Sequence, residues 1–179
     1  PIGLVGAEVE FYVTKKDNEY DKIISMEITN KNVVFELTEE DVSTFTKDKL
    51  EFFVSQNRRE EVDFDNSTVF LYNNHIEKEF NPSNLNMDNS ISIRTLDNDD
   101  DEIADVVFVF EYEDRIVKES QQDNYSFVLD KDYRGIRTML LGEDDTDAYV
   151  EIYDANGNKV DFSVITPETV VSIAMSNDG

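Results

Sequence analysis

The sequence predicts an all-β chain that forms one or two antiparallel β-sandwich modules of the immunoglobulin-like (Ig-like) kind, with at most short helical turns. Two observations predict this fold class. Short segments in which apolar and polar residues alternate recur along the whole chain, and clusters of Asn, Asp, Gly and Pro separate them. Alternation with a period of two places one face of a strand in a core, and many short strands at this spacing are typical of sandwiches and barrels.

Eleven segments carry the alternating pattern and are expected to be strands. They are Glu8–Val13, Ile23–Ile28, Asn32–Leu37, Lys49–Val54, Thr68–Tyr72, Ser90–Leu96, Asp105–Tyr112, Tyr125–Leu129, Ala148–Tyr153, Lys159–Ile165 and Thr169–Met175. Their apolar positions predict the core. The expected core residues are Phe11, Val13, Val34, Phe35, Phe52, Val69, Leu71, Val107, Val109, Phe127, Leu129, Val150, Ile152, Val160, Phe162, Val171 and Ile173.

Two other segments predict at most one or two helical turns each. The segment Thr38–Asp48 begins with an N-cap Thr, and Asp41 follows three residues later in the manner of a capping box. The segment Lys131–Leu141 has apolar residues at helical spacing, but Gly135 in its interior weakens a helix.

A boundary between two modules is expected near residue 62 or near residue 115. The earlier position is preferred, because residues 63–179 then make a sandwich of ordinary size. The sequence therefore predicts an N-terminal β module over residues 1–62 and a C-terminal β-sandwich over residues 63–179.

The charge of the chain limits its partners. The 16 basic and 41 acidic residues give a net charge of −25. This charge disfavours binding to nucleic acid, which needs clustered Lys and Arg, and to anionic membrane surfaces. No apolar run approaches the roughly 18–20 residues of a membrane span. The chain has no cysteine, which excludes a disulfide framework, a thiol nucleophile and cysteine-based metal sites.

The sequence predicts that the protein is not an enzyme. Its single histidine, His75, stands next to two Asn residues that indicate a turn. No serine lies in a G-x-S-x-G nucleophile elbow, and neither a phosphate-binding glycine loop nor an H-E-x-x-H zinc motif is present.

Two acidic runs are the candidate cation sites. Several carboxylates in one short loop suit calcium, which takes six to eight oxygen ligands, and no other cofactor is expected. The candidate metal ligands are Asp97, Asp99, Asp101, Asp144, Asp145 and Asp147. The alternative is that both runs are solvated loops whose like charges keep strand edges from pairing with other chains.

The sequence DANGN, Asp154–Asn158, also has acidic and amide oxygens at alternate positions. A calcium loop of the EF-hand type would need Gly at its sixth position and Glu at its twelfth, where this chain has Lys159 and Ile165. Asn and Gly instead favour the positive φ angles of a short hairpin turn. The sequence therefore predicts a turn here.

Two segments resemble β-modules of bacteriophage tail fibres and other virion-appendage proteins. In LLGEDDTDAYVEIYDANGNKVDFSVITPETVVSIAM, Leu140–Met175, the likeness lies in a leucine-glycine turn, a strand with Tyr at its end, the Asn156–Gly157 hairpin and a closing strand. The His-Asn pair that usually precedes the leucine-glycine turn is missing, with Met139 and Leu140 in its place. The segment Val69–Ile93 is similar to a second fibre pattern, in which an Asn turn precedes an aromatic residue.

The resemblance implies a non-enzymatic structural or adaptor protein of a phage virion, located in a tail, neck, head fibre or decoration component. Such a protein is assembled in the host cytoplasm and contacts other virion proteins and copies of itself. One alternative is a calcium-dependent adhesin module that binds carbohydrate or a cell surface through its acidic loops and surface tyrosines. A second is a DNA sliding-clamp-like processivity factor, because Tyr125–Leu141 and Ala148–Phe162 resemble a clamp's strand–helix–strand order. A clamp needs basic residues around a ring, and this chain has few.

Overall fold

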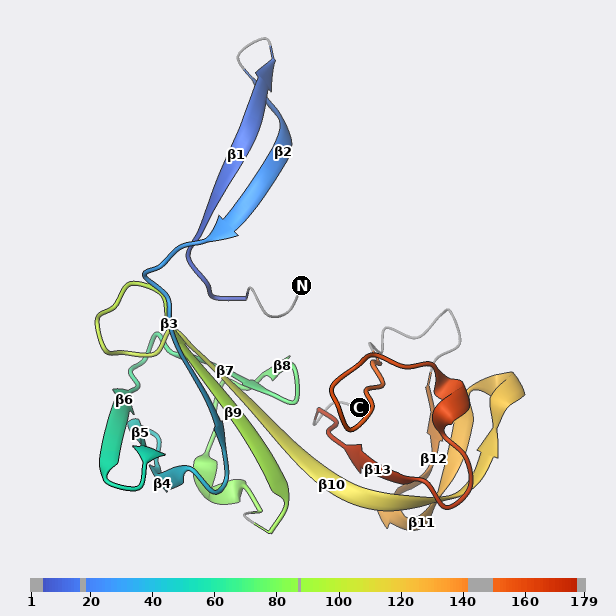
Figure 1. The fold of residues 1–179 in the computed structure, drawn as a ribbon. Helices are drawn as coiled ribbons and strands as arrows, with labels where there is room; N and C mark the ends of the chain where they lie inside the picture. The colour runs from blue at the N-terminus through green and yellow to red at the C-terminus, as the bar shows by residue number, and fades with distance from the viewer. Residues whose placement is uncertain (1–4, 17–18, 87, 142–149, 177–179) are drawn as a thin grey trace. The chain divides into compact units, whose positions relative to one another are not determined.

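The computed structural model describes residues 5–16, 19–86, 88–141 and 150–176. Within these ranges the chain is built from β-strands, mostly in antiparallel pairs, and its only helical segments are three-residue 3₁₀ turns. The all-β prediction is confirmed. The chain forms two compact units, residues 1–111 and residues 112–179, and the long strand β10 (Val106–Gln121) contributes to both (Figure 1).

Unit 1 contains two sheets and a separate hairpin. The first sheet has the order β3–β9–β10–β7–β8, formed by β3 (Val33–Thr38), β9 (Ser90–Asp97), the start of β10, β7 (Val69–Tyr72) and β8 (His75–Ile76). Its strands β7 and β10 are parallel, with Val69 opposite Val106. The second sheet is three-stranded and antiparallel, formed by β4 (Val42–Phe45), β5 (Lys49–Ser55) and β6 (Arg58–Asp63).

The core of unit 1 joins these two sheets. Its buried members come from both, and they are Leu37, Leu50, Phe52, Val62, Phe64, Tyr72, Ile91, Ile93, Ala104, Val107 and Val109. The rings of Phe35 and Phe52 pack with their centroids 4.8 Å apart. The boundary predicted after residue 62 falls inside this unit, because strands on both sides of that residue share one hydrophobic core.

The hairpin of unit 1 consists of β1 (Val9–Lys16) and β2 (Glu19–Ile28), which form a sheet of two strands (Figure 1). Hydrogen bonds fix its base: Thr29 N donates to Glu8 O at 3.1 Å, and Glu8 N donates to Asn32 Oδ1 at 2.8 Å. The prediction that Phe11 lies in the core is wrong, since this residue is 58 % exposed, and the same prediction is wrong for the exposed residues Val34, Val69 and Val150.

Unit 2 contains one antiparallel sheet in the order β13–β10–β11–β12. Its other strands are β11 (Ser126–Tyr133), β12 (Ile136–Leu140) and β13 (Val170–Ile173). The buried core residues are Val117, Phe127, Leu129, Tyr133, Met139, Phe162 and Ile165.

Both predictions of helical turns are wrong. The segment Thr38–Asp48 contains strand β4, and the segment Lys131–Leu141 is a hairpin of β11 and β12. Its turn residues Arg134 and Gly135 have φ angles of 49° and 83°. Positive φ at both central residues is the geometry of a tight hairpin turn, and glycine adopts it without steric cost. The 3₁₀ turns lie elsewhere, at Pro82–Asn84, Gln122–Asn124 and Phe162–Val164.

Two further strand predictions are not met over the described residues. Residues 150–153 and 159–165 form no named strand, and a single antiparallel bridge joins Tyr153 to Lys159. Asp161 accepts a hydrogen bond from Ser163 N at 2.9 Å and starts the 3₁₀ turn that follows. Such capping competes with strand pairing for the same backbone.

Candidate functional site

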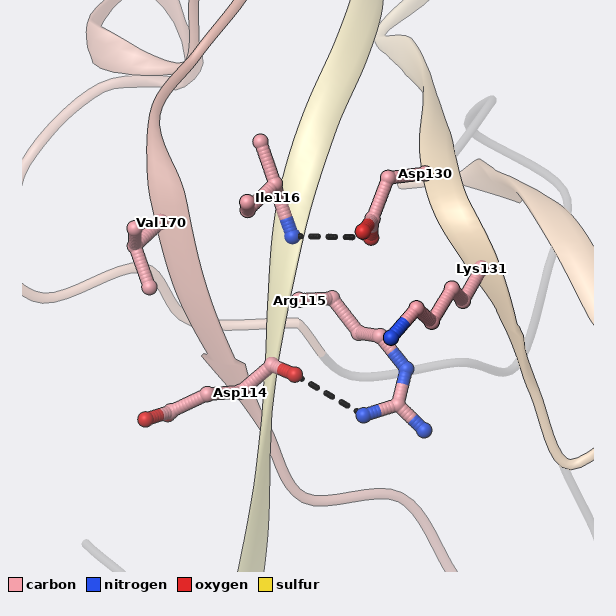
Figure 2. A pocket seen from close by; sticks show the side chains of 6 residues that line it. All are labelled: Asp114, Arg115, Ile116, Asp130, Lys131 and Val170. Atoms are coloured by element: carbon pink, nitrogen blue, oxygen red, sulfur yellow. Dashed lines mark hydrogen bonds between the residues drawn. The ribbon is translucent and has the colours of Figure 1, made fainter.

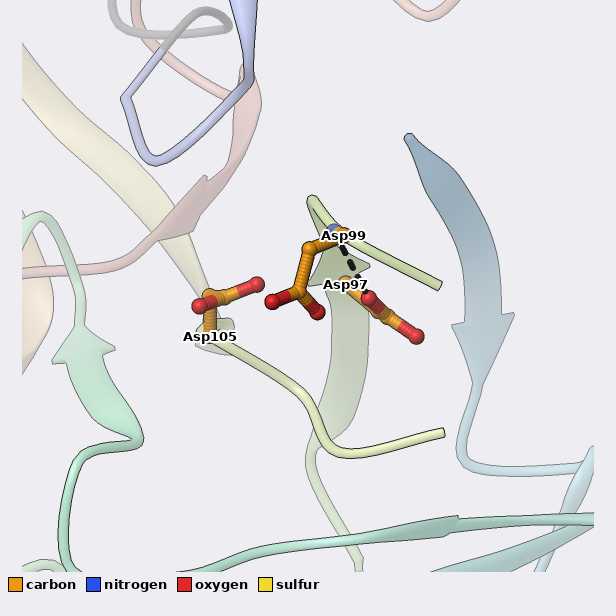
Figure 3. Close-up of side chains that lie close together, drawn as sticks. All are labelled: Asp97, Asp99 and Asp105. Atoms are coloured by element: carbon orange, nitrogen blue, oxygen red, sulfur yellow. Dashed lines mark hydrogen bonds between the residues drawn. The ribbon is translucent and has the colours of Figure 1, made fainter. Parts of the chain in front are cut away.

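The connection between β9 and β10 brings three carboxylates together. Carboxylate oxygens of Asp97, Asp99 and Asp105 all lie within 4.8 Å of one another (Figure 3). Asp97 is the last residue of β9, and Asp105 directly precedes β10. Because β9 and β10 are paired, the end of β9 lies beside the beginning of β10, and this places Asp97 close to Asp105.

Asp97 organises this loop. Its side chain is buried, and its Oδ1 accepts hydrogen bonds from Asp99 N at 3.1 Å and from Asp100 N at 2.7 Å. Its Oδ2 accepts from Glu102 N at 3.0 Å. Asp105 acts similarly, since its Oδ2 accepts from Asn98 N at 2.7 Å. A carboxylate that accepts several backbone N–H groups satisfies the donors of a tight turn and holds it in place.

The surroundings of Asp99 disfavour its charged form. Desolvation raises the pKa of Asp99, and repulsion from Asp101, Asp105 and Asp97 raises it further. A divalent cation among these oxygens would remove that repulsion. Three carboxylates supply only part of the six to eight oxygens that calcium takes, so backbone carbonyls or waters would complete the shell.

The structure groups only some of the predicted ligands. It brings Asp97 and Asp99 together, as expected, but the third carboxylate belongs to Asp105. The carboxylate of Asp101 instead accepts a hydrogen bond from Ile103 N at 2.9 Å. Asp105 is not among the predicted ligands because two uncharged residues separate it from the acidic run. The signal that points to it is its place as the first residue of a predicted strand. The predicted ligands Asp144, Asp145 and Asp147 lie outside the described residues.

The Asp154–Asn158 segment is a turn, as predicted. Asp154 Oδ1 accepts from Asn156 N at 2.8 Å and from Asn158 N at 2.9 Å, and Asn158 Nδ2 lies 3.1 Å from Asp154 Oδ2. Gly157 supplies the positive φ of 77°. Hydrogen bonds from Asn158, and then from Asn156, lower the pKa of Asp154. Both oxygens of this carboxylate are therefore used to close the turn.

A shallow hollow of about 360 Å³ lies in unit 2 beside β10 and β11 (Figure 2). Its lining residues are Asp114, Arg115, Ile116, Asp130, Lys131 and Val170. Asp130 Oδ1 accepts from Ile116 N at 3.1 Å, and Arg115 pairs with the carboxylate of Glu113. The lining therefore brings together acidic and basic side chains without a histidine or a hydroxyl group. The single histidine, His75, is exposed on β8, opposite Tyr72.

The hairpin β1–β2, called the ribbon from here on, presents one apolar face. In an antiparallel pair, directly opposed residues share a face, and alternate residues along each strand do so too. The register opposes Phe11 to Met26 and Val13 to Ile23, with Ile24 inserted as a bulge between paired positions. The resulting apolar face consists of Val9, Phe11, Val13, Ile23, Ile24, Met26 and Ile28. The opposite, polar face consists of Glu10, Tyr12, Thr14, Lys22, Ser25 and Glu27.

The apolar face is exposed. The exposed fractions are 58 % for Phe11, 58 % for Ile23, 66 % for Ile24, 47 % for Met26 and 55 % for Ile28. None of these residues belongs to the core of either unit. Contiguous exposed apolar faces of this kind are uncommon on soluble monomers.

Comparison with known proteins found no matching family, curated protein or solved structure. Among the described residues, no helix has the length and apolar character needed to span a membrane.

Proposed function

We propose that the chain is a non-enzymatic structural or adaptor protein of a phage virion, in a tail, neck, head fibre or decoration component. It acts through contacts with other virion proteins and with copies of itself, after assembly in the host cytoplasm. The observation that carries this proposal is the exposed apolar face of the ribbon in a chain whose net charge is −25. Contiguous apolar patches are rare on soluble monomers and mark sites of protein contact.

The two segments that resemble fibre modules support the proposal unequally. In Val69–Ile93, Asn73 and Asn74 have φ angles of 48° and 68° and join β7 to β8 by a tight turn. Phe80 then stacks on Phe70 with ring centroids 4.9 Å apart. In Leu140–Met175, the Asp154–Asn158 turn and the closing strand β13 fit the pattern, whereas over residues 150–165 a single bridge takes the place of the strands that should flank the turn.

The test is the presence of this chain in particles. Virions of the source phage, purified by density gradient, are analysed by mass spectrometry and labelled with antibody against the chain for electron microscopy. The proposal expects the chain in stoichiometric amounts at one place on the particle. Its absence from purified virions, together with failure of the purified chain to bind them, overturns the proposal.

A calcium-dependent adhesin module is the second candidate, and the grouping of Asp97, Asp99 and Asp105 favours it. Calcium should then raise the melting temperature of unit 1, and a chelator should reverse the rise. Asp105→Asn should abolish the effect, whereas the matched variant Asp101→Asn should retain it, because Asp101 lies outside the group. Glycan-array binding that needs calcium would favour this candidate over the virion protein.

The sliding-clamp alternative loses its main support. A helix over Lys131–Leu141 would favour it, and the structure has the β11–β12 hairpin there instead. We do not propose it.

A further inference from the structure

We infer that the apolar face of the ribbon is an interface between two copies of this chain, which pack ribbon against ribbon about a two-fold axis. The inference rests on the proposed assembly function and specifies its first contact. It follows from the shape of the ribbon, from the area of its apolar face, and from the distribution of charge.

The ribbon lacks what a small sheet needs to be stable in water. A sheet of two strands is marginal on its own, and independent stability takes more strands or packing of its apolar face. In this chain β1 and β2 pair with each other, and their large apolar side chains stay about half exposed. A second ribbon laid on the first supplies the missing layer and creates a small two-layer core.

The area of the face matches the requirement of a dimer. Large apolar side chains offer on the order of 150–200 Å² each, so the exposed fractions of Phe11, Ile23, Ile24, Met26 and Ile28 leave roughly 500 Å² of surface accessible. Stable interfaces bury about 1,200–2,000 Å² in total, which is about 600–1,000 Å² on each partner. Two copies of the face together offer roughly 1,000 Å², which is close to the lower end of that range and is the least area that a specific interface needs.

The uncharged character of the apolar face is compatible with a second copy of the chain. Two chains of net charge −25 repel each other, and a contact surface without charged side chains adds no like-charge pairs to that repulsion. The apolar face meets this condition, because its charged neighbours Glu10, Lys22 and Glu27 point to the polar face. A basic partner would be drawn to carboxylates, which this face lacks, and an anionic lipid surface would repel the chain. A two-fold axis makes the same face serve both partners.

The experiment is sedimentation equilibrium of the full chain and of two matched double variants. Phe11→Lys with Met26→Lys changes a directly opposed pair on the apolar face. Tyr12→Lys with Ser25→Lys changes the neighbouring opposed pair on the polar face. Both variants alter the net charge equally, so any difference between them reports the face and not the charge. We expect the wild type and the polar-face variant to dimerise, and the apolar-face variant to dissociate at least 100-fold more readily.

A second measurement locates the contact. The chain has no cysteine, so single variants Met26→Cys and Ser25→Cys each carry one thiol, on opposite faces of β2. A short bis-maleimide should link two copies of Met26→Cys and leave Ser25→Cys unlinked. A wild type that stays monomeric up to millimolar concentration, equal loss of dimer in both lysine variants, or equal cross-linking of both cysteine variants overturns the inference. A monomeric chain that still occurs in virions would overturn the dimer and leave the proposed function standing.

Discussion

The ribbon β1–β2 and the three-stranded sheet β4–β5–β6 are two antiparallel elements with the same alternating pattern and opposite environments. In the three-stranded sheet, Leu50 and Phe52 are fully buried against the first sheet of unit 1. In the ribbon, Phe11 likewise lies on the apolar face of an alternating strand, but it is 58 % exposed. The difference teaches that alternation determines which side chains share a face, whereas the cover of that face comes from elsewhere in the fold or from another molecule.

The largest expected effect compares the same substitution in the two elements. Phe52→Ala should lower the free energy of unfolding of unit 1 by about 3–5 kcal/mol, because it leaves a cavity among well-packed neighbours. Phe11→Ala should lower it by less than about 0.5 kcal/mol at concentrations where the chain is monomeric, because an exposed side chain loses little packing. Urea denaturation followed by circular dichroism measures both values.

The comparison would break if the two substitutions cost the same. A loss of several kcal/mol in Phe11→Ala would place the ribbon in the cooperative core of unit 1. Val62→Ala on β6 serves as an independent buried reference, since Val62 is 6 % exposed.

Strands whose apolar face packs inside the unit are also the ones that the sequence predicts best. Strands such as Lys49–Val54 and Ser90–Leu96 were predicted within one residue of β5 and β9, because their apolar faces meet a core inside the unit. The sequence does not predict strand β6. Its residues Arg58–Glu61 are all charged, and Val62 is its one buried apolar residue. Its pairing with β5 depends on neighbours that a local pattern does not contain.

The candidate cation group was predictable only in part for a related reason. Asp97 and Asp99 stand together in the sequence, whereas Asp105 joins them through the pairing of β9 with β10. Lys131–Leu141 shows the same limit: its apolar spacing fits a helix, and the Arg134–Gly135 turn makes it a hairpin. Local sequence patterns predict which residues are acidic or apolar and how they are spaced. The pairing of strands then determines which of these residues lie together.

Salt should have an intermediate effect on the association of two ribbons. Raising sodium chloride from about 0.1 M to about 1 M shortens the Debye length from about 10 Å to about 3 Å and screens the repulsion between two chains of net charge −25. The dissociation constant of the dimer should therefore fall several-fold. Sedimentation equilibrium at both salt concentrations measures it, and a dimer that weakens with salt would show that ion pairs, and not the apolar face, join the copies.

The smallest expected effect concerns the polar face of the three-stranded sheet, which carries ion pairs. Lys49 Nζ lies 2.7 Å from Glu61 Oε2 and also pairs with Glu51, and the hydrogen bond from Lys49 lowers the pKa of Glu51. A lowered pKa stabilises the fold above the usual glutamate value of 4.5, and this contribution is lost as the pH falls through the lower value of the folded state. Lys49→Met should therefore cost a little stability near neutral pH and nothing in acid, as measured by urea denaturation across the pH range. The lysine is exposed enough that salt screens the difference, so an effect as large as that of Phe52→Ala would show that the polar face, and not the core, holds this sheet.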